Sequence, residues 1–115
     1  MTSDEFAKNF YLEKLSFLKS CFEEHPKYPS AVNVKIKEMA LDSTQQEQLK
    51  EVIDTLLTDV FYTVLLGLDG ESSIGNIQRT YKIYDQDDNL ISDCGELEAS
   101  AYEYFHEGKY KGECD

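Results

Sequence analysis

The chain has 115 residues, of which 41% are hydrophobic, and its formal net charge at pH 7 is −12. This apolar content suffices for the core of one domain spanning 1–115, and it excludes a chain kept disordered by charge. The negative charge disfavours binding to nucleic acid and to anionic membranes, and it attracts basic partners.

A helix is the first element predicted. Thr2 and Glu5 have the T-x-x-E spacing of a capping box. Apolar side chains then recur every three or four positions through residues 7–22, which indicates one buried helical face. Pro26 disfavours helical backbone in the residue before it, so we expect the helix to end near Glu24.

A strand and a second, longer helix follow. Apolar and polar side chains alternate in residues 32–37, which is typical of a half-exposed strand. The second helix is predicted to open at Asp42 or Ser43, with Ser43 and Gln46 spaced as a capping box. A long apolar stripe continues from there, and a glycine, Gly67 or Gly70, ends the helix.

The next segment has the pattern of a β-hairpin. Residues 69–76 (DGESSIGN) are rich in turn formers and predict a loop. Residues 77–84 (IQRTYKIY) give the strongest strand signal in the chain, and 85–89 (DQDDN) predict a turn. Residues 90–91 then begin a short return strand.

A third helix is predicted to start near Cys94, because Asp93 and Glu96 are spaced as an N-cap and its partner. Its expected inner face consists of Leu97, Ala101, Tyr104 and Phe105. The polar tail 108–115 is expected to fray. The order α-β-α-β-β-α predicts an α+β fold, with three helices packed on a small, largely antiparallel sheet.

Cysteine usage favours a reducing compartment. Cys21, Cys94 and Cys114 form an odd, scattered set without a C-x-x-C pair or a histidine at ligand spacing. Neither a disulfide framework nor a thiolate metal site is expected from them. The first residues, MTSDEF, also lack the features of a secretion signal. We therefore expect a soluble, cytoplasmic protein without a cofactor.

The most specific motif is a partial match to a calcium-binding loop. Residues 85–96 place oxygen-bearing or carbonyl positions at 1, 3, 5, 7, 9 and 12 of an EF-hand. However, Leu90 stands where that loop needs glycine, and the segment before Asp85 has the pattern of a strand. We therefore interpret 85–89 as an acidic hairpin turn and expect no metal there.

An enzyme is the alternative interpretation. The loop 69–76 and His106 could contribute to a small active site or ligand site, but the loop lacks the GxxxxGK[ST] pattern of a phosphate cradle. No serine or cysteine near His25 or His106 lies in a recognisable nucleophile motif. The sequence therefore favours a protein that binds without catalysis.

The acidic surface is the main functional signal. Residues 85–115 contain two lysines and ten acids, a net charge of 2 − 10 = −8. Carboxylates and tyrosine rings together suit a Lys- or Arg-rich partner. The predicted binding residues are Asp85, Asp87, Asp88, Glu96, Tyr102, Glu103 and Glu107, with Asp69 and Glu71 as a further loop contribution. Glu98 is expected to point to one side of this face.

Three stretches resemble a known group of proteins. They are Tyr62-Thr-Val-Leu-Leu-Gly-Leu-Asp-Gly-x-x-Ser-Ile-Gly, Tyr81-x-Ile-Tyr-Asp, and Gly95-Glu-Leu-Glu continuing to Tyr102-Glu-Tyr-Phe-His106. Across roughly residues 60–107 the chain resembles small acidic bacterial proteins encoded beside polymorphic toxins, in particular immunity proteins of contact-dependent growth inhibition systems.

The resemblance implies an acidic protein that neutralises one cognate toxin domain by stoichiometric binding. Many such toxins are basic nucleases, so a negative partner would associate quickly with them. The partner predicted from sequence is therefore a basic toxin domain, and neither nucleic acid nor a membrane. A homodimer is a further alternative, because the many aromatic side chains could cover a self-complementary face.

Overall fold

The computed structural model describes residues 1–92 and 95–111 of the chain. In these residues the chain forms four helices: α1 (Ser3–Phe22), α2 (Ala31–Glu38), α3 (Ser43–Leu68) and α4 (Glu96–His106). Within the same residues, β pairing is confined to two isolated bridges, Ile74–Ile77 and Tyr84–Leu90. The predicted α+β fold on a small antiparallel sheet is therefore wrong, because the described chain is helical.

The start of α1 matches its prediction. Thr2 is the N-cap, and its side-chain oxygen accepts a hydrogen bond from the backbone N–H of Glu5 at 3.1 Å. The helix ends at Phe22, where Glu23 turns to extended backbone ahead of Pro26. This end lies two residues before the expected one, within the usual uncertainty of helix boundaries.

α2 occupies the segment predicted as a strand over 32–37. Ser30 caps it, since its hydroxyl oxygen accepts a hydrogen bond from the backbone N–H of Asn33 at 3.1 Å. Asn33 and Ile36, three residues apart, are buried, whereas Val32 and Val34 are exposed. The alternation was misleading because, in so short a segment, a period of two and one helical face can share apolar positions.

α3 begins with a capping box one residue earlier than predicted. The carboxylate of Asp42 accepts a hydrogen bond from the Gln45 backbone N–H at 2.8 Å, and the Gln45 side-chain oxygen accepts one from the Asp42 N–H at 3.0 Å. The helix ends at Leu68, and Gly70 follows with φ of +84°, a conformation that favours glycine.

Residues 77–92 form a loop in place of the predicted hairpin. The turn at 85–89 is present, because the backbone N–H of Asp88 donates to the Asp85 carbonyl at 3.1 Å. The predicted strands 77–84 and 90–91 are wrong, since a single isolated bridge, Tyr84–Leu90, joins the two segments, and Ile77 pairs instead with Ile74 in the preceding loop.

Ser92 explains why the pairing stops there. Its hydroxyl accepts a hydrogen bond from the Ile83 backbone N–H at 3.0 Å and lies 3.3 Å from the Tyr81 carbonyl, to which it donates. A side chain therefore satisfies backbone groups that would otherwise pair with a neighbouring strand. The sequence shows that a polar residue stands at position 92, but it does not show that the Ser92 hydroxyl competes with strand pairing for these backbone groups.

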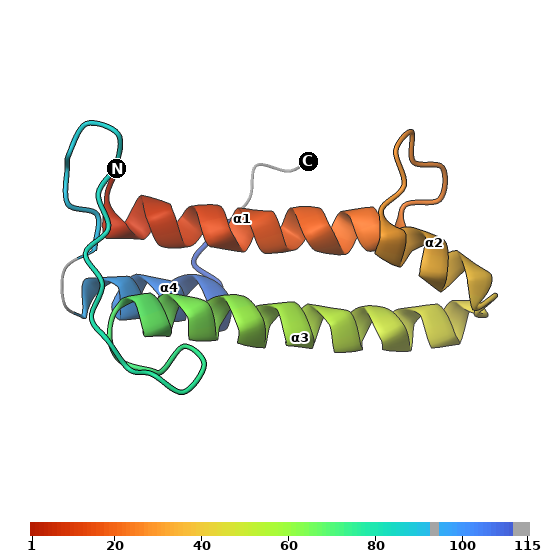
Figure 1. The fold of residues 1–115 in the computed structure, drawn as a ribbon. Coiled ribbons are helices and arrows are strands. Elements are labelled where there is room, and N and C mark those ends of the chain that lie inside the picture. Colours follow the sequence, from red (N-terminus) through yellow and green to blue (C-terminus); the bar gives the residue numbers. More distant parts are fainter. Residues whose placement is uncertain (93–94, 112–115) are drawn as a thin grey trace.

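The helices form an antiparallel pair covered at one end. α1 and α3 run in opposite directions, and α4 lies beside the N-terminal part of α1 and the C-terminal part of α3 (Figure 1). The shared core consists of Ala7, Leu65, Leu97, Ala101, Tyr104 and Phe105. The predicted inner face of the third helix is therefore confirmed, although α4 begins at Glu96 and the predicted cap Asp93 and start Cys94 lie outside the described residues.

The opposite end is thin. There α2 packs on the end of α1, and α3 passes below without cover from α4 (Figure 1). The Cα radius of gyration is 16.4 Å, compared with about 13 Å for a compact domain of this length. Across the described residues, no helix has the length and apolar character needed to cross a bilayer.

Candidate functional site

α4 presents its buried face to the core and its glutamates outward, and its first turn is stabilised by α3. Gly95, the N-cap, offers no side chain, and the carboxylate of Asp69 accepts a hydrogen bond from the Glu98 backbone N–H at 3.1 Å instead. Asp69 is buried and directly follows α3. Because a negative charge near a helix N-terminus is favourable, this bond fixes the start of α4 against the end of α3.

A shallow hollow lies between α4 and α3, and we call it the α4 hollow. Its volume is about 510 Å³, and its lining residues are Tyr62, Gly95, Glu98, Ala99, Tyr102, Glu103 and Glu107. The ring centroids of Tyr62 and Tyr102 lie 6.5 Å apart. Carboxylates and aromatic rings therefore share one concave surface.

The hollow is electronegative. Burial raises the pKa of the Tyr62 phenol, and the charge of Glu98 raises it further. At neutral pH the phenol is therefore protonated and can donate a hydrogen bond. A guanidinium or ammonium group entering the hollow would meet carboxylate acceptors and ring faces together.

The structure brings three of the predicted binding residues together here: Tyr102, Glu103 and Glu107. Glu103 already has an internal partner, since its carboxylate lies 3.1 Å from the Lys109 ammonium, which also lies 2.6 Å from Asp4. Tyr102 and Glu107 are exposed. Lys109 thus ties the segment after α4 to α1, and Tyr102 and Glu107 stay available.

Two other predicted residues lie at the N-terminus of α1. The Asp85 carboxylate is 3.3 Å from the N-terminal ammonium of Met1, and a Glu96 carboxylate oxygen is 3.5 Å from the Ser3 hydroxyl. In Figure 1 the 85–89 turn lies beside the N-terminus, away from α3. The structure therefore divides the predicted face into two parts.

Asp85 is mainly structural. Its carboxylate accepts hydrogen bonds from the backbone N–H groups of Asn89 at 3.0 Å and Asp87 at 2.8 Å. These bonds, that of Asn89 first, lower the pKa of Asp85 to about 2. Asp87 and Asp88 are exposed, and the predicted interpretation of this segment as an acidic turn is confirmed.

The predicted loop acids join the α4 hollow through Glu98. Asp69, Glu71 and Glu98 each place one carboxylate oxygen within 4.8 Å of the others. Oxygen ligands at this spacing could accommodate a hard divalent cation, and they could equally accept hydrogen bonds from a cationic side chain. Glu98 belongs to both groups and therefore joins the loop acids to the α4 hollow.

The residues of the alternative enzyme interpretation lie in different surroundings. The His106 ring packs edge-on against Tyr62, with centroids 4.5 Å apart, and it also contacts Tyr102. Ser73, Ile74 and Gly75 of the 69–76 loop line another hollow with Val60 and Val64 of α3. His106 therefore extends the aromatic wall of the α4 hollow.

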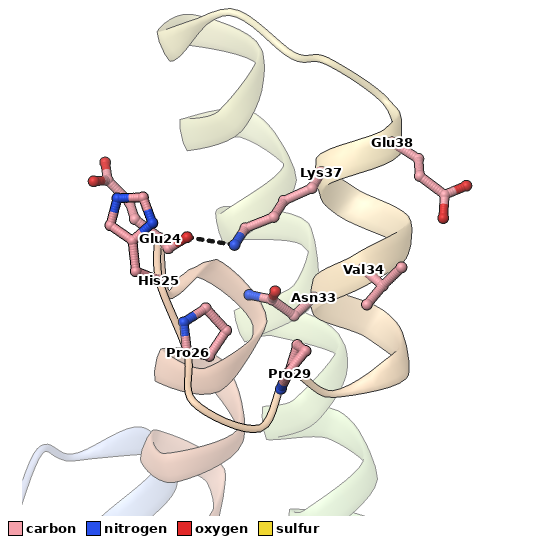
Figure 2. A pocket seen from close by; sticks show the side chains of 8 residues that line it. All are labelled: Glu24, His25, Pro26, Pro29, Asn33, Val34, Lys37 and Glu38. Carbon is pink, nitrogen blue, oxygen red and sulfur yellow. Dashed lines mark hydrogen bonds between the residues drawn. The ribbon is translucent and has the colours of Figure 1, made fainter.

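A larger cavity, of about 600 Å³, lies where α2 meets the end of α1, and Figure 2 shows it from close by. Asn33 projects into it from α2, and its side-chain amide donates to the carbonyls of Ser20, Cys21 and Glu23 at 2.9–3.2 Å. Lys37 donates to the Glu24 carbonyl in the same region. These polar groups therefore satisfy backbone carbonyls at the end of α1.

Sequence reasoning missed Tyr62 and the role of Glu98. Tyr62 was one of several apolar or aromatic residues along a long helix, and only the packing of α4 across α3 shows which of them borders a hollow. For Glu98 a signal existed: helical spacing places it four residues before Tyr102 on one side of α4.

Cys21, the described cysteine, is buried, and burial raises the pKa of its thiol, which disfavours the reactive thiolate. Cys94 and Cys114 lie outside the described residues. Comparisons of the chain with protein families, with curated proteins and with solved structures found no match.

Proposed function

We propose that the chain is an acidic binding protein that neutralises a cognate basic toxin domain by stoichiometric binding. The observation that carries this proposal is the α4 hollow, in which Glu98 and Glu107 border the rings of Tyr62 and Tyr102. The net charge of −12 and the resemblance to immunity proteins support the same interpretation. The protein acts without turnover, as a partner that covers a surface of the toxin.

The hollow suits a single basic anchor. An Arg or Lys side chain of the partner would form charge-assisted hydrogen bonds to the carboxylates and stack on a tyrosine ring. Glu107 and Tyr102 are exposed before binding, so the anchor displaces water there, and within the described part of the chain Glu98 and Glu107 have no ion pair for it to break. Hydrogen bonds to charged groups contribute about 1.5–3 kcal/mol each, enough for one anchor to dominate an interface.

Long-range charge would set the association rate. Asp87 and Asp88 lie in the turn beside α1 and do not line the hollow. In this proposal they contribute to the field that attracts the basic partner, while the hollow holds it. Substitutions in the two regions should therefore affect different rate constants.

The test compares two variants of equal charge change. In E98Q/E107Q the hollow loses two carboxylates, and in D87N/D88N the turn loses two. Each variant and the wild type would be used to capture partners from the source cell, and the captured protein would be tested for toxicity on its own. We expect one basic, toxic protein in a 1:1 complex with the wild type.

Stopped-flow mixing with that protein then separates the regions. E98Q/E107Q should raise the dissociation rate about tenfold or more, whereas D87N/D88N should mainly slow association and reduce its dependence on salt. A captured partner without toxicity, or equal dissociation rates for both variants, would contradict the proposal. Cell growth during co-expression provides the functional readout.

A further inference from the structure

α3 carries an exposed apolar stripe in the part that α4 does not cover. Val52, Leu56 and Val60 follow one another at intervals of four residues, with exposed fractions of 63%, 57% and 47%. Residues four apart form one ridge on a helix surface. Isolated exposed apolar side chains are ordinary, but three in register on one ridge make a continuous surface.

Two adjoining hollows lie along this stripe. One, of about 560 Å³, has Val52 and Leu56 in its wall, and the other, of about 390 Å³, has Val60 and Val64. Asp59 lines both hollows and therefore joins them. We call the combined surface the α3 groove. From residue 52 to residue 64 it extends roughly 18 Å, the length of three to four helical turns.

The loop after α3 closes one end of the groove. Ile74 lines the second hollow and is 42% exposed. It lies so close to Gly67 that a Cβ atom added at Gly67 would be 2.4 Å from the Ile74 Cγ1 atom. Because glycine permits this contact, Ile74 is held in place against α3 before any partner arrives. The groove is thus pre-formed at this end.

The charge of the groove determines what can occupy it. Glu51 and Asp59, both exposed, line the groove beside the apolar stripe. A second copy of the chain would bring a further charge of −12, and a two-fold interface would place these acids near their own copies. A helix with Lys or Arg beside its apolar face would complement both the stripe and the acids.

We propose that the α3 groove binds an amphipathic helix that is basic on the flanks of its apolar face and belongs to a partner protein. The apolar ridge of that helix packs alongside Val52, Leu56 and Val60, and its basic residues pair with Glu51 and Asp59. This inference goes beyond the toxin interaction at the α4 hollow and does not depend on it, because the two surfaces involve different residues.

The experiment uses two synthetic 18-residue peptides with identical leucine positions, one with lysine and one with glutamate at the remaining positions. Fluorescence anisotropy at physiological salt would measure their binding to the full chain. We expect the Leu/Lys peptide to bind 1:1 and the Leu/Glu peptide not to bind. The V52Q/L56Q variant should weaken binding at least about tenfold, because it removes the apolar ridge without changing charge.

One variant serves as the control. V32Q/V34Q replaces exposed valines on α2 without changing the charge, and it should bind the Leu/Lys peptide within about twofold of the wild type. D59N should weaken binding about two- to fivefold, as expected for an exposed ion pair. Circular dichroism would confirm that each variant retains its helices.

Equal weakening by V32Q/V34Q, or binding of the Leu/Glu peptide as tight as that of the Leu/Lys peptide, would overturn the proposal. Sedimentation equilibrium without peptide tests the other occupant. A wild-type dimer that V52Q/L56Q converts to a monomer would assign the groove to a second copy of the chain. A monomeric wild type supports the basic helix.

Discussion

At the scale of single residues, Asn33 links two helices. It is 1% exposed, and its amide group donates to three carbonyls at the end of α1, while its own Oδ1 has no hydrogen-bond partner among the residues that the structure describes. Turning the amide over would place Oδ1 against those carbonyl oxygens, so the three donated bonds fix its orientation.

We predict that Asn33→Ala lowers the free energy of unfolding by about 1–3 kcal/mol, because it leaves buried carbonyls unsatisfied. Asn9→Ala is the matched control, since Asn9 is exposed on α1 and its replacement should change stability by about 0.5 kcal/mol or less. Urea denaturation followed by circular dichroism measures both. Equal effects of the two substitutions would show that the junction does not depend on Asn33.

Asp85 makes stability depend on pH. Its pKa is about 2 in the folded chain, chiefly because of the backbone bond from Asn89, compared with an ordinary value of 3.8. A lowered carboxyl pKa contributes stability above the ordinary value, and that contribution is lost as the pH falls toward the folded value. We therefore expect the 85–89 turn to lose stability between about pH 4 and pH 2.

The check is the thermal midpoint of Asp85→Asn and Asp88→Asn across this pH range. Asp85→Asn should show a smaller loss than the wild type, because its side chain no longer takes up a proton. Asp88→Asn removes the same charge from the same turn and should keep the wild-type slope, since the backbone bonds from Asp87 and Asn89 go to the Asp85 carboxylate. Asparagine also tolerates the φ of +63° at position 88. A wild-type slope in Asp85→Asn would contradict the assignment.

At the scale of elements, the beginning of α3 offers two alternative capping boxes that mutation can tell apart. The sequence favoured Ser43 with Gln46, and the structure uses Asp42 with Gln45. Asp42→Ala should therefore lower the free energy of unfolding by about 0.5–2 kcal/mol, whereas Ser43→Ala should have little effect or a small favourable one from helix propensity. Chemical denaturation of the two variants decides between them. A larger loss in Ser43→Ala would restore the sequence-based assignment.

The elements show which signals in the sequence were sufficient. α1 and α3 were predictable because a capping residue and a long apolar stripe mark each of them independently of the rest of the chain. α2 was missed because Val32, Val34 and Ile36 fit a strand, while the deciding cap at Ser30 lay outside the pattern. The strand at 77–84 failed for another reason: strand propensity requires a partner, and Ser92 takes up the adjacent backbone groups.

In the candidate site, too, local sequence patterns predicted some features, and contacts between distant residues decided the others. Helical spacing within α4 was enough to place Tyr102, Glu103 and Glu107 close together. It could not add Tyr62, because that residue joins the hollow through packing between α3 and α4. It also could not show that Asp85 and Glu103 are engaged by Met1 and Lys109 respectively. Contacts between residues distant in sequence carry this information.

At the scale of the whole molecule, the two ends differ in how much they bury. The end with α4 contains the core around Leu65 and Leu97, both fully buried. At the other end the buried apolar side chains include Cys21 and Ile36, whereas Val52 and Leu56 of α3 are exposed. Since burial of apolar surface is the main stabilising contribution, the end with α2 should open more easily.

We therefore predict two levels of amide hydrogen exchange. Backbone amides in α4 and in residues 61–68 of α3 should exchange only through global unfolding, whereas those in α2 and in residues 46–56 of α3 should exchange through a local opening of lower free energy.

Two core substitutions test this difference. Leu65→Ala, which leaves a cavity in the core, should lower the free energy of unfolding by about 2–5 kcal/mol and speed exchange throughout the chain. Ile36→Ala should speed exchange mainly in α2 and in the end of α1 on which α2 packs. Uniform protection along α3 in the wild type would show that the two ends unfold as one unit. Slowing of exchange in residues 46–56 on addition of the Leu/Lys peptide would, in turn, show that occupation of the α3 groove stabilises the thin end.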